Sequence, residues 1–270
     1  MSEYLEKLIT RDVSKITAKK AFISDMDGVI YHGNKLLDGA KELVEWLKRE
    51  NKDFLFLTNS SERSPLELSK KLERLGLEID ESHFYTSALA TASFLASQCP
   101  GGSAYVIGEA GLLNALYNAG ITMNDVNPDY VVVGESRSYS YEKIEKAIHL
   151  VLGGAKLIGT NTDLTGPSER GILPACRALT APIELATGRS AYFIGKPNPL
   201  IMRHAMRKLG CKRGEAVIIG DRMDTDIVAG IQTEMDTVLV LTGVTGEKEL
   251  REMPYRPTFI LNGVGDIVPR

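Results

Sequence analysis

Two aspartates, Asp25 and Asp27, directly follow the apolar run Ala21–Ser24 and are the strongest chemical feature of the sequence. Side chains alternate along a strand, so residues two apart point to the same side. The carboxyl ends of strands in an open α/β sheet are the edge where ligands bind. Two carboxylates this close repel each other unless a cation or a proton lies between them. The pair indicates a charged ligand site, although Asp-x-Asp-Gly also occurs as a solvated turn.

Three further apolar runs end in polar residues of related chemistry. They run from Phe54 to Asn59, from Phe193 to Lys196 and from Val217 to Asp226. A hydroxyl, an ammonium group and more carboxylates therefore join the aspartate pair at predicted strand ends. This combination suits Mg²⁺-assisted phosphoryl transfer, in which positive charge neutralises the phosphoryl oxygens.

The elements that must position these residues alternate between strand and helix. One helix is predicted by apolar residues at helical spacing, namely Ala40, Leu43, Val44 and Leu47. A second begins at the capping box Ser64–Glu67 and ends near Gly76. Strand–helix–strand units of this length form parallel sheets with right-handed crossovers. We therefore expect a Rossmann-like α/β core.

The spacing of the four fragments predicts an insertion. The interval from Asp25 to Thr58 has room for one crossover helix, whereas the interval from Thr58 to Lys196 has room for a domain. That second interval has an α/β rhythm of its own, with strands expected near 104–107, 130–133 and 156–159 and helices near 112–117 and 144–151. We therefore expect an inserted α/β domain at 87–189 and a discontinuous core from 1–86 and 190–270.

Composition limits the partners of this chain. Its 270 residues carry a net charge of −3, which argues against a binder of nucleic-acid polymers. The three cysteines, Cys99, Cys176 and Cys211, show no metal-binding spacing and suggest reduced thiols in the cytoplasm. No run reaches the roughly 18 apolar residues of a membrane span, and no signal-peptide pattern is present. We expect a cytoplasmic protein without a membrane partner.

Taken together, the four fragments resemble the four motifs of the phosphatases of the haloacid dehalogenase (HAD) superfamily. The chain is most similar to the NagD-like branch (class IIA), which includes nucleotide, p-nitrophenyl phosphate and pyridoxal phosphate phosphatases. The segments Phe84–Ala88, Asp125–Asp129 and Gly220–Ile227 add to this resemblance, which begins at about Ala21. The inserted domain resembles the C2-type cap of that superfamily.

The resemblance implies a covalent mechanism. Asp25 would be the nucleophile and form an aspartyl-phosphate. Asp27 would protonate the leaving oxygen and then activate the water that hydrolyses this intermediate. The alternative for Asp25 is a metal ligand without covalent chemistry.

The resemblance also implies three phosphate-binding residues. Thr58 and Asn59 would bind phosphoryl oxygens through a hydroxyl and a backbone N–H, and Lys196 would pair with the phosphate and the nucleophile. The alternatives are a polar strand terminus for the first two and a surface lysine for the third.

A Mg²⁺ cofactor is implied as well, since this ion takes carboxylate and carbonyl oxygens and keeps several waters. Its ligands would be Asp25, the backbone carbonyl of Asp27, and Asp221. Asp226 would bind the ion directly or support a residue that does. Arg222 and Met223 share this loop and are expected to contact substrate.

Selectivity is expected from the inserted domain. Asn161 and Asp163 lie in a segment that resembles the NagD-type loop facing the active site, although the two residues also suit a surface turn. The following segment, 165–170, departs from that loop because it is longer and has no histidine. This departure leaves the leaving group open. All four histidines, including His32, are interpreted as structural.

We therefore predict a Mg²⁺-dependent phosphomonoesterase of small phosphorylated metabolites, with nucleoside monophosphates such as UMP favoured. The alternatives are a sugar-phosphate or pyridoxal-phosphate-type phosphatase, or a phosphotransferase of the same fold. A catalytically silent binding protein is disfavoured by the complete motif set. The expected partner is a small phosphate ester, and a homodimer is compatible with the sequence.

Overall fold

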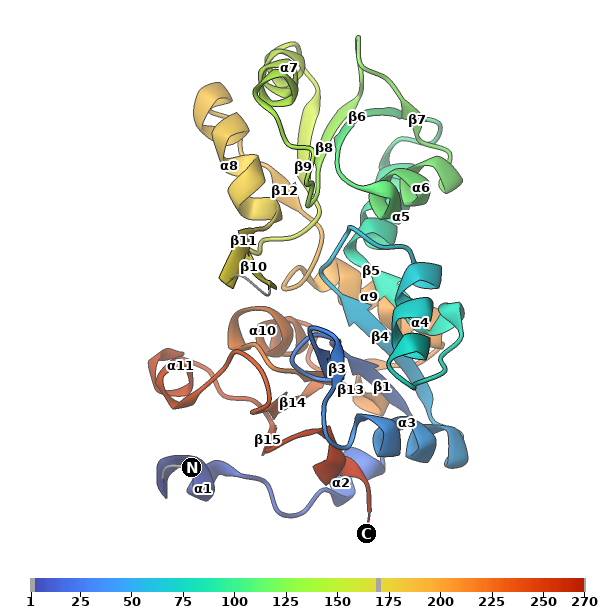
Figure 1. The fold of residues 1–270 in the computed structure, drawn as a ribbon, viewed down its shortest axis with the longest axis vertical. Coiled ribbons are helices and arrows are strands. Elements are labelled where there is room, and N and C mark those ends of the chain that lie inside the picture. The colour runs from blue at the N-terminus through green and yellow to red at the C-terminus, as the bar shows by residue number, and fades with distance from the viewer. Residues whose placement is uncertain (1–2, 169–170, 270) are drawn as a thin grey trace. The chain divides into compact units, whose positions relative to one another are not determined.

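The computed structural model describes residues 3–168 and 171–269, which form two compact units. The first unit comprises Met1–Thr58, Lys71–Phe84 and Met202–Arg270. The second comprises Asn59–Lys70 and Tyr85–Ile201. Elements from both ends of the chain, blue and red in Figure 1, therefore belong to the same unit.

A six-stranded sheet forms the centre of the first unit within the described residues, in the order β15-β14-β13-β1-β4-β5. Its strands are β1 (Ala21–Ser24), β4 (Asp53–Thr58), β5 (Phe84–Thr86), β13 (Ala216–Gly220), β14 (Asp236–Val240) and β15 (Phe259–Leu261). β1 pairs in parallel with both β4 and β13. All four residues of β1 are buried, as expected for the centre of a parallel sheet. The predicted parallel-sheet α/β fold is thus confirmed.

Amphipathic helices cover this sheet. α3 (Ala40–Arg49) buries all four apolar residues that predicted it, together with Trp46. The Trp46 ring meets the Phe22 ring of β1 edge to face, with centroids 5.5 Å apart, so α3 packs directly on the central strand. The other helices that lie wholly in this unit are α1 (Glu3–Leu8), α2 (Ser14–Thr17), α10 (Val228–Gln232) and α11 (Glu247–Glu252), while α9 (Pro199–Leu209) begins in the second unit.

The helix α4 (Pro65–Arg74) begins and ends as predicted. The Ser64 N–H donates to the Glu67 carboxylate at 2.7 Å, and the Glu67 N–H donates back to the Ser64 hydroxyl at 3.3 Å. This is the expected capping box. Gly76 adopts a φ of 88°, the left-handed conformation that glycine supplies after a helix.

A second parallel sheet, in the order β12-β9-β8-β6-β7, forms the centre of the second unit within the described residues. Its strands are β6 (Ser103–Ile107), β7 (Thr122–Met123), β8 (Tyr130–Val133), β9 (Lys156–Gly159) and β12 (Tyr192–Phe193). Helices α5 (Ser87–Gln98) and α6 (Ala110–Asn118) lie on one face, and α7 (Tyr141–Leu152) and α8 (Cys176–Thr187) lie on the other (Figure 1). A hairpin of β10 (Thr165–Ser168) and β11 (Gly171–Pro174) precedes α8.

The strand that leads to Lys196 belongs to this second sheet. Tyr192 and Phe193 of β12 pair with Ile158 and Gly159 of β9. The second unit includes β12 and continues to Ile201. The inserted domain expected from the sequence ends earlier, at residue 189. Among the helices of the described residues, none combines the length and apolar character that a membrane crossing requires.

Candidate active site

Three carboxylates meet at the carboxyl edge of the first sheet. Asp25 follows β1, Asp221 follows β13, and Asp226 lies in the π-helical turn η3 (Met223–Ile227). One carboxylate oxygen from each lies within 4.8 Å of the others. Register explains the meeting, since Ser24, the last residue of β1, pairs with Ile219 and β13 ends one residue later, at Gly220. The sequence predicted this group, and the structure brings it together.

Two glycines make room for the Asp221 carboxylate. A Cβ at Gly243 would lie 1.9 Å from Asp221 Oδ2, and a Cβ at Gly28 would lie 2.5 Å from the same atom. The Val244 N–H donates to Asp221 Oδ2 at 2.7 Å. Asp221 is only 2% exposed. Close backbone on two sides and a donated hydrogen bond therefore fix the orientation of this carboxylate.

Asp226 is held in a comparable way. A Cβ at Gly220 would lie 2.4 Å from Asp226 Oδ2, and the Arg222 N–H donates to that oxygen at 3.2 Å. Asp226 is fully buried, whereas Asp25 is partly exposed. Three acidic groups so close together repel one another, and a hard cation with oxygen ligands removes that repulsion. The donor set fits Mg²⁺.

Asp27 lies on the loop after β1, and its side chain is 44% exposed. Partial burial raises the pKa of Asp27, while His32 and Lys71 oppose the shift through their charges. The His32 Nδ1 lies 3.5 Å from Asp27 Oδ1, because the hairpin of β2 (Tyr31–His32) and β3 (Lys35–Leu36) returns the chain toward it. Sequence reasoning interpreted His32 as structural and missed this contact, although the Gly33-Asn34 turn is a hairpin signal.

Thr58 is the last residue of β4, which neighbours β1 in the sheet. Ser24 pairs with Phe56, so Thr58 lies at the same edge of the sheet as Asp25. The sequence predicted that both residues lie at the ends of apolar strands in a parallel sheet, and the pairing of β1 with β4 is a finding of the structure.

The remaining predicted phosphate and cap residues form a hydrogen-bonded group within the second unit. The Asn59 Oδ1 accepts the Lys196 N–H at 2.7 Å, and the Asn59 Nδ2 donates to the Lys196 carbonyl at 3.0 Å. The same Nδ2 donates to Asp163 Oδ2 at 3.0 Å. Lys196 is 1% exposed, so its side chain is enclosed by protein.

Asn161 is fully buried in this group. Its Nδ2 donates to the Asn59 carbonyl at 2.7 Å and to Glu135 Oε1 at 2.5 Å, and its Oδ1 accepts the Asp163 N–H at 3.0 Å. These contacts use the polar atoms of the side chain within the protein. They favour a structural function for Asn161 over contact with substrate.

Glu135 is part of the group and was not predicted. It follows Gly134 at the carboxyl end of β8. Its Oε2 accepts the Ser61 N–H at 3.1 Å and also the Ser61 hydroxyl. Burial raises the pKa of Glu135, and the hydrogen bonds from Ser61 and Asn161 oppose that shift. A carboxylate that follows an apolar strand after one intervening residue was the available signal, similar to the one that identified Asp25.

The two other residues predicted to contact substrate have partners in the first unit. The Arg222 guanidinium donates to both carboxylate oxygens of Asp224, at 3.0 and 2.9 Å. Met223 is 2% exposed and packs in a core cluster with Ile227 and Leu239. Its position favours a packing function. In the predicted loop 165–170, Glu169 and Arg170 lie outside the described residues.

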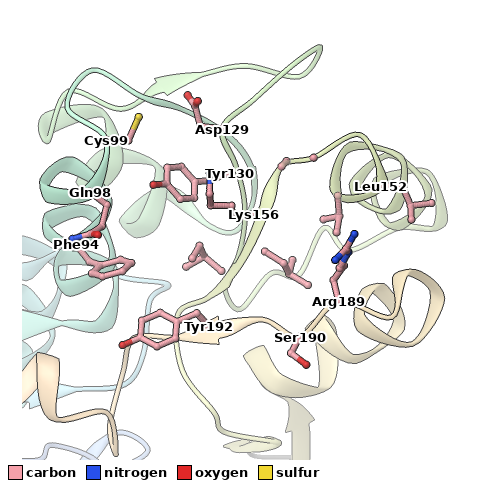
Figure 2. A pocket seen from close by; sticks show the side chains of 15 residues that line it. Phe94, Gln98, Cys99, Asp129, Tyr130, Leu152, Lys156, Arg189, Ser190 and Tyr192 are labelled. Atoms are coloured by element: carbon pink, nitrogen blue, oxygen red, sulfur yellow. The ribbon is translucent and has the colours of Figure 1, made fainter.

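The second unit also contains a pocket of about 760 Å³, none of whose lining residues is a predicted site residue. Figure 2 shows Phe94 and Gln98 of α5 on one side and Arg189 and Ser190 on the other. The Phe94 and Tyr192 rings lie 5.5 Å apart. The pocket is therefore separate from the group around Asn59.

Comparisons with known proteins agree with this geometry. A family model described as haloacid dehalogenase-like hydrolase matches residues 22–122, and a related HAD-hydrolase-like model matches residues 193–267. The chain is 46% identical over 252 residues to a dihydroxyacetone phosphatase of Corynebacterium glutamicum, covering 93% of this chain and 92% of the relative. It is 43% identical over 248 residues to the ribonucleotide monophosphatase NagD of Escherichia coli, covering 92% and 98%.

The solved structure of NagD from E. coli superposes with a TM-score of 0.87 at 42% identity, covering 93% of this chain and 100% of that one. Identity at this level over nearly the whole of each chain confirms the resemblance of the motifs. This chain belongs to the haloacid dehalogenase-like hydrolases and is a phosphatase of their NagD-like branch.

Proposed function

We propose that this phosphatase depends on Mg²⁺ and hydrolyses small phosphomonoesters through an aspartyl-phosphate on Asp25. One observation carries the proposal, namely the meeting of Asp25, Asp221 and Asp226 at the carboxyl edge of a parallel sheet. Ligands bind at this edge in open α/β sheets. The relatives named as phosphatases support the hydrolysis of phosphomonoesters by this chain.

The metal would be held by Asp25, Asp221 and the backbone carbonyl of Asp27, with Asp226 binding it directly or supporting a ligand. Carboxylate and carbonyl oxygens are the donors that Mg²⁺ prefers. When bound, the ion would neutralise charge on the phosphoryl oxygens and orient the phosphate for attack. The clustering of three carboxylates, two of them buried, supports this assignment.

In the first step, a carboxylate oxygen of Asp25 attacks phosphorus while the bond to the leaving oxygen breaks. Asp27, in its protonated form, gives its proton to that oxygen, so an alcohol leaves. In the second step, water attacks the aspartyl-phosphate and gives a proton back to Asp27, which regenerates both aspartates and releases phosphate. The raised pKa of Asp27 favours the protonated form that the first step needs.

Thr58, Asn59 and Lys196 would bind the phosphoryl oxygens, as the resemblance implies. The enclosed Lys196 supports this assignment, because a lysine ammonium in a low-dielectric environment interacts strongly with an anion. The hydrogen bonds between Asn59 and the Lys196 backbone support a common function for the two residues.

Nucleoside monophosphates such as UMP are one proposed substrate class, supported by the similarity to the ribonucleotide monophosphatase NagD. A triose or sugar phosphate is the second candidate, supported by the 46% identity to a dihydroxyacetone phosphatase. Asp163 would contribute to the choice between them. The C2-type cap at 87–189, a cytoplasmic location and a homodimer stay predictions.

A substrate panel tests the proposal. The purified protein is assayed with UMP, dihydroxyacetone phosphate, a hexose phosphate, pyridoxal phosphate and p-nitrophenyl phosphate, with Mg²⁺ and after removal of metal by chelator. We expect metal-dependent release of phosphate from at least one metabolite, and none from Asp25→Asn. Metal-independent hydrolysis, or hydrolysis that survives Asp25→Asn, would overturn it.

A further inference from the structure

We propose that Glu135 is a positioning residue of this phosphatase, which holds the segment Asn59–Ser61 and, through Asn59, the backbone of Lys196. This inference rests on the proposed function of Lys196. It concerns a residue that does not contact the phosphate. The contacts that carry it all lie within the second unit.

Glu135 is placed against Ser61 by a close approach of backbone. A Cβ at Gly134 would lie 2.5 Å from the Ser61 Oγ, so a larger residue there would displace Ser61. The Gly134 N–H donates to the Ile107 carbonyl at 2.8 Å, which continues the pairing of β8 with β6. The end of β8 therefore holds the backbone of Glu135 next to Ser61.

The Glu135 carboxylate then joins two segments that are far apart in the sequence. Oε2 accepts the N–H and the hydroxyl of Ser61, and Oε1 accepts the Asn161 Nδ2. The Glu135 N–H donates to the Ser61 Oγ at 3.3 Å, which adds a contact in the opposite direction. A carboxylate suits this position because three donors point at it and it offers only acceptors.

Asn161 and Asn59 transmit this restraint to Lys196. The Nδ2 that reaches Glu135 also reaches the Asn59 carbonyl at 2.7 Å. The Asn59 side chain in turn pairs with the N–H and the carbonyl of Lys196. Three successive hydrogen-bonded contacts thus connect Glu135 to the Lys196 backbone. A shift of about 1 Å in a binding group can lower turnover roughly 100-fold, so this restraint has a catalytic effect.

Glu135→Gln tests the inference, because glutamine has the same shape but directs an NH₂ group toward donors. Asp129→Asn is the matched control. Asp129 Oδ2 accepts the N–H and hydroxyl of Ser103 at 2.8 and 2.9 Å, the same pairing at the other end of β8. We expect Glu135→Gln to lower kcat for p-nitrophenyl phosphate roughly 10- to 100-fold, with a smaller change in KM. The Mg²⁺ concentration for half-maximal activity should not change, and Asp129→Asn should keep kcat within about twofold.

Hydrogen–deuterium exchange gives a readout that does not depend on activity. In Glu135→Gln, the peptide containing Lys196 should exchange faster, since the Lys196 N–H is bonded to Asn59. In Asp129→Asn it should exchange at the wild-type rate. If Glu135→Gln does not fold, Ser61→Ala carries both measurements, with changes of the same sign.

The outcomes are distinguishable. Equal kcat in the wild type, Glu135→Gln and Asp129→Asn, with unchanged exchange at Lys196, would overturn the inference while leaving the proposed function intact. An equal fall of kcat in both variants would reduce Glu135 to a general structural residue. A wild type without metal-dependent phosphatase activity would instead contradict the proposed function, and exchange alone would then decide whether Glu135 restrains Lys196.

Discussion

Asn59 and Lys196 are joined by two hydrogen bonds between the amide side chain of the first and the backbone of the second. Asn59 Oδ1 accepts the Lys196 N–H at 2.7 Å, and Asn59 Nδ2 donates to the Lys196 carbonyl at 3.0 Å. This pairing has the pattern of a short strand ladder, made by a side chain. It fixes the backbone that carries the predicted phosphate-binding ammonium group.

Asn59→Ala should therefore lower both stability and turnover. Loss of the side chain leaves a buried N–H and carbonyl of Lys196 without this partner, which costs about 1–3 kcal/mol in the free energy of unfolding. Urea unfolding and steady-state kinetics with p-nitrophenyl phosphate measure the two effects. Asn124→Ala is the control, because the Asn124 Oδ1 accepts the Val126 N–H at 2.9 Å in an exposed turn. Equal effects of both variants would contradict a special function for Asn59.

Asp25→Asn should abolish turnover without unfolding the protein. An amide is a poor nucleophile and a weaker ligand for Mg²⁺ than a carboxylate, so kcat should fall by several orders of magnitude. Stopped assays of phosphate release, together with circular dichroism, check both parts. A variant that kept even about a tenth of the wild-type kcat would exclude Asp25 as the nucleophile.

Activity should require Mg²⁺ and be suppressed when Ca²⁺ replaces it. Ca²⁺ takes about 6–8 oxygen ligands at longer distances, so it would draw both oxygens of Asp25 and spoil the geometry of attack. The carboxylates of Asp221 and Asp226 would remain available to either ion. Phosphate release is measured after dialysis against chelator and after readdition of each ion. Full activity in excess EDTA would remove the metal from the mechanism.

Asn161→Ala should lower kcat/KM by a similar factor for a small aryl phosphate and for the best metabolite substrate. Asn161 is buried and bonded to Asn59 and Glu135. These two residues are proposed to hold the phosphate-binding Lys196, and every substrate carries the phosphate. Asp163→Ala is the comparison, since Asp163 also bonds to Asn59 but, unlike Asn161, is partly exposed. Its loss should be greater for the metabolite, by roughly 1–3 kcal/mol. A selective loss in Asn161→Ala would restore the sequence-based view that this residue reads the leaving group.

The pH dependence of stability should report the burial of Glu135. Burial raises the pKa of Glu135 above its usual 4.5. A carboxyl group whose pKa is higher in the folded protein than in the unfolded protein contributes its full stabilisation when the pH is below the unfolded pKa. This contribution is lost as the pH rises through the folded pKa. The wild type should therefore lose unfolding free energy relative to Glu135→Gln as the pH rises above 4.5. The neighbouring Cys176, with a pKa of about 11, stays protonated throughout.

Urea unfolding of both proteins across a series of pH values measures this difference. Other carboxylates titrate equally in the two proteins, so the difference between the curves isolates Glu135. Curves that stay parallel across the series would show that the Glu135 carboxyl has the same pKa in the folded and unfolded protein.

The sequence predicted most of the first unit because its signals are local. Apolar residues at helical spacing predicted α3, the Ser64–Glu67 capping box predicted the start of α4, and apolar runs predicted the central strands. Asp25 and Asp221 could be placed together because parallel strands end at a common edge. The motifs supplied the strand ends and the resemblance grouped the two residues, whereas the pairing of β1 with β13 is a finding of the structure.

The contacts that escaped prediction are those that depend on side chains from distant segments. Ser61 and Glu135 are 74 residues apart, and no periodicity connects them. Asn161 reads as a loop residue because Asn favours turns, yet tertiary contacts bury it. The strand before Lys196 was predicted. The sheet to which it belongs was not, because only its pairing with β9 shows that.

The membership of Asn59–Lys70 in the second unit affects how this protein can be dissected. A fragment cut at the boundaries 87 and 189 would lack Ser61 and end before β12. Glu135 would remain at the end of β8 but lose both donors from Ser61. Such a fragment is therefore expected to be less stable than one that retains 59–70. A fragment in which a linker joins 59–70 to 85–201 would keep these contacts and is the smaller piece to express.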